Sequence, residues 1–277
     1  TKKEIEILVA QKLESIAKEA NLPGFRPGKV PVSVVKNRFG KQVLGEVVRE
    51  SVDTASKDTM EKNKLDYTVI LCNDGSSDRT KEIIQSSRDS YPIHFIDHKI
   101  NRGLGETSRD NFEAAAELSN NEDIIIRMDC DDTHEPIFIL DLIKKIKEGY
   151  DVVIASRFQK GGGQQGVNSY RKFISYGANI FMKCFFPIKG VRDYSCGYRA
   201  YSAGIIKKAI KNYGNSFIQL KGLGFTCTLE KLLKLKLLNA NFSEIPFVLR
   251  YDKKQGASKM VTSLTTFGYF SLVLLYY

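Results

Sequence analysis

The chain has 277 residues, 42% of them hydrophobic, which is enough for a sizeable core and excludes a globally disordered protein. Its formal net charge of +10 favours an acidic partner, which could be nucleic acid, anionic lipid or a phosphorylated substrate. Five scattered cysteines show no metal-ligand or redox spacing, which indicates a reducing compartment.

The N-terminal part is predicted to be helical. Residues 11–20 and 32–64 carry apolar side chains at helical spacing. Between them, the prolines and glycines of NLPGFRPGKVP specify an exposed loop that carries Phe25, Arg26 and Lys29. An exposed aromatic ring beside two cations suits stacking and phosphate contacts on RNA. The alternative is an ordinary turn in which the ring is tucked against the protein.

The loop GFRPGKVP resembles the ribosome-docking signature GFRxGKxP of trigger factor, a bacterial chaperone. The matching positions are Gly24, Phe25, Arg26, Gly28, Lys29 and Pro31. The resemblance covers residues 12–65 and implies a ribosome contact through residues 24–31. The first strands of that family are reduced here to at most EIEILVA, and its isomerase and substrate-cradling domains have no counterpart downstream.

From Asp66 onward, short apolar strands alternate with helices. The predicted strands are YTVILC, IHFID, DIIIRM and DVVIAS, and the predicted helices are SSDRTKEIIQSSR, ETSRDNFEAAAELS and PIFILDLIKKIKEG. This alternation predicts an α/β fold with right-handed crossovers and a mostly parallel sheet flanked by helices. The continuous apolar run of DIIIRM predicts a buried strand.

Two of these strands end in acidic loops, one at Asp74 and one at Asp129 and Asp131. Ligands of open α/β sheets collect at the carboxyl ends of the strands. The spacing of Asp129 and Asp131 lets both carboxylates face one hard cation such as Mg²⁺ or Mn²⁺. A cation and a bound diphosphate would also relieve the repulsion between the carboxylates. The alternative is a solvated acidic turn that caps the helix starting at Pro136.

An ordered series of motifs extends over residues 66–260: NDGSSDRT, MDCDDTHEP, ASRFQKGGG, YRKFISYGAN, VRDYSCGYRAY and QGASKM. Together they resemble family 2 glycosyltransferases of the GT-A (Rossmann-like) fold, and among these the dolichol- or polyprenyl-phosphate mannosyltransferases and related glucosyltransferases. The resemblance implies inverting transfer of a mannose- or glucose-class sugar to polyprenyl or dolichyl phosphate. It also implies a GDP-mannose- or UDP-glucose-class donor and Mg²⁺ or Mn²⁺ as the cofactor.

The family's roles fall on single positions of this chain. Asp74 matches the acidic residue that helps to hold the nucleotide, and Asp129 and Asp131 match the DxD ligands of the metal and the sugar nucleotide. Arg157 and Arg171 match cations near the diphosphate or the acceptor phosphate. Asp131 and Arg157 are therefore the expected catalytic residues.

Three further positions follow from the same resemblance. Lys259 matches a basic residue of a mobile loop that closes over the phosphates. The family arginine six residues earlier is Lys253 here, which keeps the charge of that arginine without its bidentate geometry. Thr133 stands where the family has a better metal ligand.

The acceptor decides whether a general base is needed. A phosphate acceptor is already anionic near neutral pH, so its oxygen can attack the anomeric carbon without a base. A hydroxyl acceptor would need one, and the candidates are Asp132, Asp193 and His134.

Two apolar segments bear on the acceptor and the membrane. In RKFISYGANIFMKCFF, one helical face is apolar and its flanks are basic, which suits an interfacial helix at a membrane, and an ordinary core helix is the alternative. The apolar residues 261–277 fall short of the roughly 20 residues that span a bilayer. They are predicted as a helix that either begins a membrane segment or packs in the core. The expected location is the cytoplasmic face of a membrane.

The expected domain organisation has three parts. Residues 1–65 form a truncated trigger-factor-like segment, residues 66–260 a family 2 transferase domain and residues 261–277 a C-terminal helix. Nothing before Asp66 matches the first strand and the Pro-x-Tyr-Asn-like loop with which family 2 enzymes begin. Three hypotheses remain: a sugar transferase, a ribosome-docking chaperone fragment and an inert chimera of the two.

Overall fold

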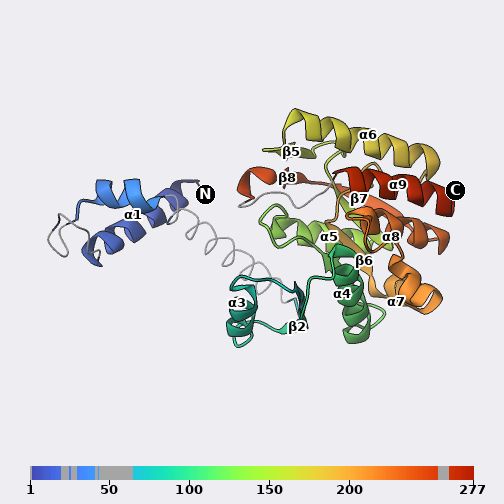
Figure 1. The fold of residues 1–277 in the computed structure, drawn as a ribbon, viewed down its shortest axis with the longest axis horizontal. Helices are drawn as coiled ribbons and strands as arrows, with labels where there is room; N and C mark the ends of the chain where they lie inside the picture. The colour runs from blue at the N-terminus through green and yellow to red at the C-terminus, as the bar shows by residue number, and fades with distance from the viewer. Residues whose placement is uncertain (1, 20–24, 26–29, 41–42, 44–64, 255–261) are drawn as a thin grey trace. The chain divides into compact units, whose positions relative to one another are not determined.

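The structure is a computed structural model that describes residues 2–19, 25, 30–40, 43, 65–254 and 262–277. Its contacts divide the chain into two units, Thr1–Asp66 and Tyr67–Tyr277 (Figure 1).

Most of the described residues of the first unit are helical. It contains α1 (Lys2–Glu19), and residues 32–40 are also helical. The segment EIEILVA lies inside α1, so its expected role as a strand remnant is wrong. Residues three or four apart lie on the same face of a helix, so each helical stretch has an apolar face. The two apolar faces pack against each other. The resulting small core consists of Leu13, Ala17, Val30, Val35 and Val43.

The described residues of the second unit form three sheets. The first pairs β1 (Val69–Asp74) with β2 (Ile93–His98), and the second has the strand order β3 (Ile124–Arg127), β6 (Arg199–Ser202), β4 (Val152–Ser156) and β7 (Phe242–Pro246). The third pairs β5 (Gly163–Gln165) with β8 (Val248–Arg250). Among the described strands, β1–β2, β4–β7 and β5–β8 are parallel, while β6 runs antiparallel to both of its neighbours.

Helices connect and cover these strands (Figure 1). They are α3 (Thr80–Ser87), α4 (Leu104–Leu118), η1 (Pro136–Phe138), α5 (Ile139–Lys147), α6 (Ser169–Phe185), α7 (Ala203–Tyr213), η2 (Gly214–Ile218), α8 (Thr226–Leu237), η3 (Tyr251–Lys253) and α9 (Thr262–Tyr276). Helix α4 packs on β1, and α5 packs on β3, β4 and β6. The α/β fold that the alternating pattern predicted is therefore confirmed.

Two strands of similar apolar sequence differ in burial. Every residue of β4 is buried, whereas every residue of β3 is only half-buried. The prediction of a buried β3 is wrong in this respect. Strand β4 lies between β6 and β7, but β3 pairs with β6 alone among the described strands, so its other edge lacks the cover that a neighbouring strand gives.

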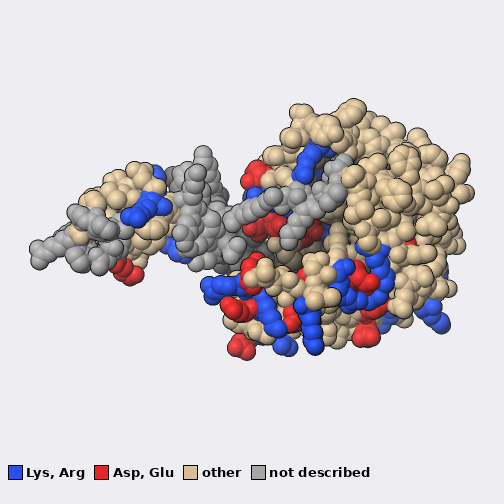
Figure 2. Space-filling view, in the orientation of Figure 1, with Lys and Arg blue, Asp and Glu red and all other residues tan. Residues whose placement is uncertain are grey.

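Helices α6 and α9 pack along each other through aromatic rings. The ring centroids of Phe181 and Phe270 lie 5.3 Å apart, and those of Phe185 and Tyr277 lie 5.4 Å apart. In Figure 2, few charged side chains interrupt the surface over these helices, whereas charges gather over α3 and α4. Within the described part of the chain, no helix has both the length and the apolar character needed to cross a membrane.

Candidate functional site

A cavity of about 550 Å³ lies in the second unit, beside the carboxyl end of β3. Its lining combines charged side chains with an apolar wall to which α6 and α9 contribute. The polar lining includes Arg127, Asp129, Asp131, Arg157, Arg171 and Lys254, and the apolar wall includes Phe173, Phe181, Tyr269 and Phe270. The fold thus brings both carboxylates of the DxD motif to one cavity with Arg157.

Asp129 is held by a strand residue and a buried histidine. Its Oδ1 atom lies 2.7 Å from Nη2 of Arg127, the last residue of β3. Its backbone N–H donates to Nδ1 of His134 at 2.9 Å, so the proton of the neutral ring is on Nε2, which lies 3.8 Å from Oδ2 of Asp129. Burial lowers the pKa of His134 to about 4. The ring is therefore neutral near pH 7 and orients Asp129.

Asp131 is held differently. Its Oδ1 atom accepts a hydrogen bond from Oγ1 of Thr133 at 2.6 Å, and its Oδ2 atom contacts Nζ of Lys254. Partial burial acts to raise the pKa of Asp131, but the bonds from Lys254 and Thr133 outweigh it and hold the pKa below its usual value. Asp131 is thus a carboxylate near neutral pH.

These residues fit a divalent cation that keeps few protein ligands. Mg²⁺ is commonly bound through one or two carboxylates together with substrate phosphates and water. Asp129 and Asp131 supply two such carboxylates, while the hydroxyl of Thr133 is engaged with Asp131. In the part of the chain that the structure describes, no group of three or more His, Cys, Asp or Glu side chains could hold a metal. A diphosphate and water would therefore complete the coordination.

Arg157 reaches the cavity from the end of β4 and is paired with Asp193. Its Nε and Nη2 atoms donate to the two carboxylate oxygens at 2.7 Å each, and Nη2 also donates to Oγ of Ser195 at 2.6 Å. Burial acts to raise the pKa of the enclosed Asp193, but the charge of Arg157 keeps that pKa low. This pairing leaves Asp193 unsuited to act as a general base.

The predicted cations from the later motifs are placed in different environments. Arg171, in the first turn of α6, donates from Nη1 to Oη of Tyr251 at 2.6 Å, and both residues line the cavity. Lys253 binds Oε1 of Glu135 at 2.6 Å and does not line the cavity. Its neighbour Lys254 does, although the sequence motifs did not single it out. Lys259 lies outside the described residues.

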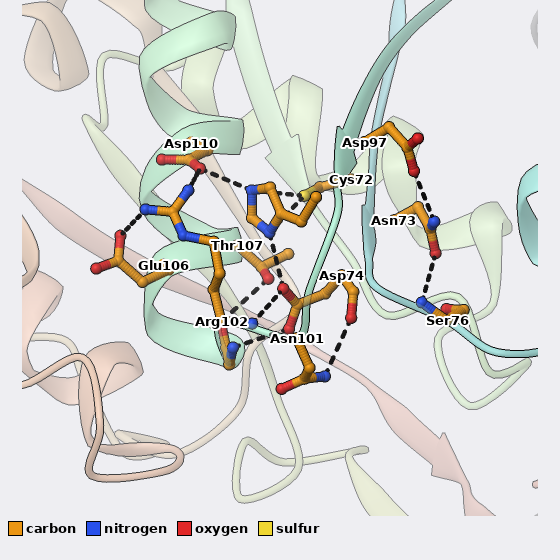
Figure 3. A network of polar contacts seen from close by, with 12 residues as sticks. Cys72, Asn73, Asp74, Ser76, Asp97, Asn101, Arg102, Glu106, Thr107 and Asp110 are labelled. Atoms are coloured by element: carbon orange, nitrogen blue, oxygen red, sulfur yellow. Dashed lines mark hydrogen bonds and ion pairs between the residues drawn. The ribbon is translucent and has the colours of Figure 1, made fainter.

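Asp74 belongs to a separate cluster at the carboxyl ends of β1 and β2 (Figure 3). Its Oδ1 atom accepts from Nδ1 of His98 at 2.7 Å and from the backbone N–H of Arg102 at 2.8 Å, and Oδ2 accepts from the N–H of Gly103 at 2.9 Å. The other ring nitrogen of His98 lies 2.8 Å from Oδ2 of Asp110. Asp74 does not line the cavity. Its role in holding the nucleotide stays a prediction.

The charge of His98 follows from these contacts. The hydrogen bond to Asp74 raises the pKa of the ring, and the bond to Asp110 adds to this effect against the opposing influence of burial. A protonated ring donates both N–H groups, one to each carboxylate. His98 thus links β1, β2 and α4. No sequence motif indicated this role.

The ribosome-docking residues stay untested. Phe25 is 38% exposed, in agreement with an exposed loop tip. Arg26 and Lys29 lie outside the described residues.

Comparison with known families defines the class of protein as an enzyme, a glycosyltransferase. The sequence profile of Glycosyl transferase family 2 matches residues 32–210, more than half of the chain. The chain therefore belongs to family 2 of the glycosyltransferases. It is 30% identical over 197 residues to a dolichol-phosphate mannosyltransferase of Pyrococcus furiosus. That alignment covers 71% of this chain and 51% of the relative, so the chain spans about half of its length.

Two further similarities concern the fold and a short segment. Glucosyl-3-phosphoglycerate synthase from Mycobacterium tuberculosis, solved with Mn²⁺, uridine diphosphate and phosphoglyceric acid, aligns with a TM-score of 0.51 and 16% identity over 81% of this chain and 72% of that chain. This likeness shows a GT-A-like fold. A 62-residue stretch is 47% identical to trigger factor of Rhodospirillum centenum and covers 22% of this chain and 14% of that protein.

Proposed function

We propose that this glycosyltransferase moves a mannose- or glucose-class sugar from a nucleotide diphosphate to polyprenyl or dolichyl phosphate, with inversion at the anomeric carbon. One observation carries the proposal: the cavity joins an acidic metal-type site to an apolar wall that reaches the surface. Phe173 and Phe270 line the cavity and are also 74% and 55% exposed. A lipid chain can therefore follow this wall out of the cavity while its phosphate stays at the polar end.

The polar side of the cavity is proposed to bind the donor. Asp129 and Asp131 would hold Mg²⁺ or Mn²⁺ together with the diphosphate of a GDP-mannose- or UDP-glucose-class donor. When bound, the cation stabilises the charge that develops on the departing diphosphate. Arg157 and Arg171 would place positive charge beside the two phosphate groups, with Arg157 fixed in position by its pairing with Asp193.

The acceptor phosphate is proposed to react directly. One of its oxygens attacks the anomeric carbon from the face opposite the diphosphate, and the bond between that carbon and the diphosphate oxygen breaks, with its electron pair leaving on the diphosphate. No proton has to be removed from an anionic phosphate. This accords with the state of two base candidates, because the buried His134, with a pKa lowered to about 4, is a weak base and Asp193 is paired with Arg157.

The outer face of α6 and α9 is proposed to lie on the cytoplasmic surface of a membrane. It exposes a set of apolar and aromatic side chains, with Lys172 and Lys183 on the same helix α6. The exposed side chains of the two helices include Tyr170, Phe173, Tyr176, Ile180, Phe267, Phe270 and Leu274, and the exposed Tyr277 follows α9. An apolar face flanked by lysines fits anionic headgroups over an acyl boundary.

A transfer assay tests the proposal. The protein is incubated with radiolabelled GDP-mannose or UDP-glucose, vesicles that contain polyprenyl phosphate, and Mg²⁺ or Mn²⁺, and the organic phase is extracted. The expected result is labelled lipid that requires the divalent cation and disappears in Asp131→Asn. Absence of labelled lipid with either donor at any cation concentration would contradict the proposed function.

A second function is supported by the trigger factor similarity. We propose that residues 1–65 form a truncated ribosome-docking segment. A transferase domain over residues 66–260 and a helix over residues 261–277 would follow it. The profile of the transferase family begins earlier, at residue 32. Co-sedimentation with ribosomes is expected and should be lost when Phe25, Arg26 and Lys29 are changed to Ala. An inert chimera would show neither sugar transfer nor co-sedimentation.

A further inference from the structure

Each carboxylate of the DxD motif has its own protein cation. Asp129 contacts Arg127, and Asp131 contacts Lys254. Arg127 ends β3 and passes against Gly197, where a Cβ atom would lie only 1.9 Å from its Nη1 atom. The missing side chain of Gly197 therefore makes room for Arg127 beside Asp129.

Lys254 reaches Asp131 through a flexible side chain. It follows the short helix η3 and approaches Asp131 from 123 positions away in the sequence, on a flexible four-carbon stem. Its Nζ atom also lies 5.6 Å from the centre of the Tyr251 ring. Its carboxylate and aromatic contacts are both on the cavity wall, so the ammonium group can move within the cavity without disturbing the core.

The contacts of Asp131 engage both of its carboxylate oxygens. The Oδ1 atom accepts a hydrogen bond from the hydroxyl of Thr133, and the Oδ2 atom accepts one from the ammonium group of Lys254. A metal bound through Oδ2 would meet Lys254 directly. An ammonium group and a divalent cation on the same carboxylate oxygen repel each other. Binding of the metal therefore has to compete with Lys254 for Asp131.

A second cation of the cavity lies near Lys254. Arg171 contacts the same Tyr251, with a hydrogen bond of 2.6 Å to its Oη atom and 5.7 Å from the guanidinium carbon to the ring centre. Arg171 and Lys254 thus approach one aromatic ring on the cavity wall. A diphosphate placed beside Asp129 and Asp131 would meet both cations.

We infer that Lys254 is the resident counter-ion of Asp131, that a divalent cation displaces it, and that its ammonium group then contacts the diphosphate of the donor. This inference rests on the proposed function, because it needs a metal and a nucleotide diphosphate in this cavity. It assigns to Lys254 the contact that the family motif places on Lys253. The structure instead pairs Lys253 with Glu135, away from the cavity lining.

Mn²⁺ binding without nucleotide tests the first half of the inference. The full chain is titrated with Mn²⁺, and free Mn²⁺ is measured by electron paramagnetic resonance. Removing the competing cation in Lys254→Met should tighten Mn²⁺ binding by about two- to fivefold, the range expected for one partly exposed ion pair. Lys81→Met is the matched control, because Lys81 forms a comparable pair with Asp97 at 2.6 Å outside the cavity. Its Mn²⁺ affinity should equal that of the wild type.

Nucleotide binding tests the second half. With Mn²⁺ saturating, calorimetry with UDP and GDP should show affinity weakened on the order of tenfold in Lys254→Met, because a charge-assisted hydrogen bond to phosphate is lost. The loss in Lys253→Met should be smaller. In Lys254→Met, Mn²⁺ binding should become tighter while nucleotide binding becomes weaker. A simple loss of structure would instead weaken the binding of both ligands.

The outcomes separate this inference from the proposed function. Unchanged or weaker Mn²⁺ binding in Lys254→Met overturns the inference, and so does a larger nucleotide effect in Lys253→Met. These results would leave the proposed function intact, provided that the wild type binds Mn²⁺ and nucleotide. A wild-type chain that binds neither ligand overturns both.

Discussion

The second unit carries two acidic strand ends that hold their charges in different ways. At the end of β1, Asp74 accepts from two backbone N–H groups and from His98 (Figure 3). At the end of β3, Asp129 and Asp131 rely on the side chains of Arg127 and Lys254. The first arrangement fills the carboxylate oxygens with donors from β2 and from the loop before α4. The second leaves the carboxylates on a cavity wall.

The difference teaches what makes an acidic cluster available to a ligand. Backbone N–H groups cannot leave Asp74 unless the loop before α4 moves, so that carboxylate mainly joins structural elements. The ammonium group of Lys254 can leave Asp131 by rotation about side-chain bonds alone. Similar residue types at equivalent strand ends therefore favour a structural brace in one case and a ligand site in the other.

The largest effect is a loss of stability expected at Asp193, whose carboxylate is more enclosed than those of either cluster. Asp193 is fully buried and paired with Arg157, so Asp193→Asn should lower the free energy of unfolding by about 3–5 kcal/mol because it leaves a buried arginine without its counter-charge. Urea denaturation measures the change. The exposed pair of Asp252 and Arg250 is the control, and Asp252→Asn should cost less than about 1 kcal/mol. Equal losses in the two variants would show that the enclosure of Asp193 is unimportant.

The next effect concerns ligand binding at the open cluster. Asp131→Asn should weaken Mn²⁺ binding by about 100-fold, because it removes one of two carboxylate ligands. Its free energy of unfolding should change little, since the carboxylate is partly exposed and its charge is compensated by a mobile lysine. Mn²⁺ titration and urea denaturation of the same preparation give both numbers. If Asp131→Asn were strongly destabilised but bound Mn²⁺ normally, Asp131 would serve the stability of the fold and not metal binding.

The closed cluster should behave in the opposite way. Asp74→Asn should lower the free energy of unfolding by about 1–2 kcal/mol, because charge-assisted hydrogen bonds to His98 and the two backbone N–H groups are weakened. Mn²⁺ affinity without nucleotide should fall far less than in Asp131→Asn. If Mn²⁺ binding falls equally in both variants, Asp74 shares in the metal site and the two strand ends act together.

The smallest effect is a pH dependence of stability. His98 has a folded-state pKa raised above 6.5, so its contribution is fully present below about pH 6.5 and is lost as the pH rises through the folded pKa. Asp74 and Asp110 have folded-state pKa values lowered below 3.8, although burial opposes the shift, so their contribution is present above pH 3.8 and is lost on further acidification. The cluster therefore stabilises the fold most between these limits.

A variant of the histidine tests this window. His98→Gln should lose stability relative to wild type at about pH 6. This loss should shrink towards about pH 9, because the wild-type ring loses its charge as the pH rises through its raised folded-state pKa. Urea denaturation across this range measures the difference. A constant difference between wild type and variant would mean that the charge of His98 is irrelevant.

The extent to which the fold could be predicted differs between local and non-local features. The strands and helices from Val69 to Ser156 were predicted from runs of apolar residues and helical periodicity, because these patterns depend on near neighbours in the chain. The burial of β3 was not predictable, since it depends on which strands pair with it. EIEILVA has the composition of a strand and forms part of α1, where its place in a longer helix outweighs local preference.

The candidate site shows the same division. The motifs pointed to Asp129, Asp131, Arg157 and Arg171, and the fold brings all four to one cavity. Arg127 and Lys254 were missed, because an arginine at a strand end and one of two adjacent lysines give no distinct sequence signal. Only the fold shows that Lys254, rather than Lys253, faces the cavity.

The sequence by itself determined the family, the alternation of strands and helices, and the residue types available at the carboxyl ends of the strands. These properties are written in order and spacing along the chain, which are the same in the unfolded and the folded state. The tertiary structure alone decided which carboxylates are enclosed by fixed donors and which face a cavity with exchangeable cations. Long-range packing sets both the solvation and the neighbouring charges of a carboxylate, and these two factors decide whether it can bind a ligand.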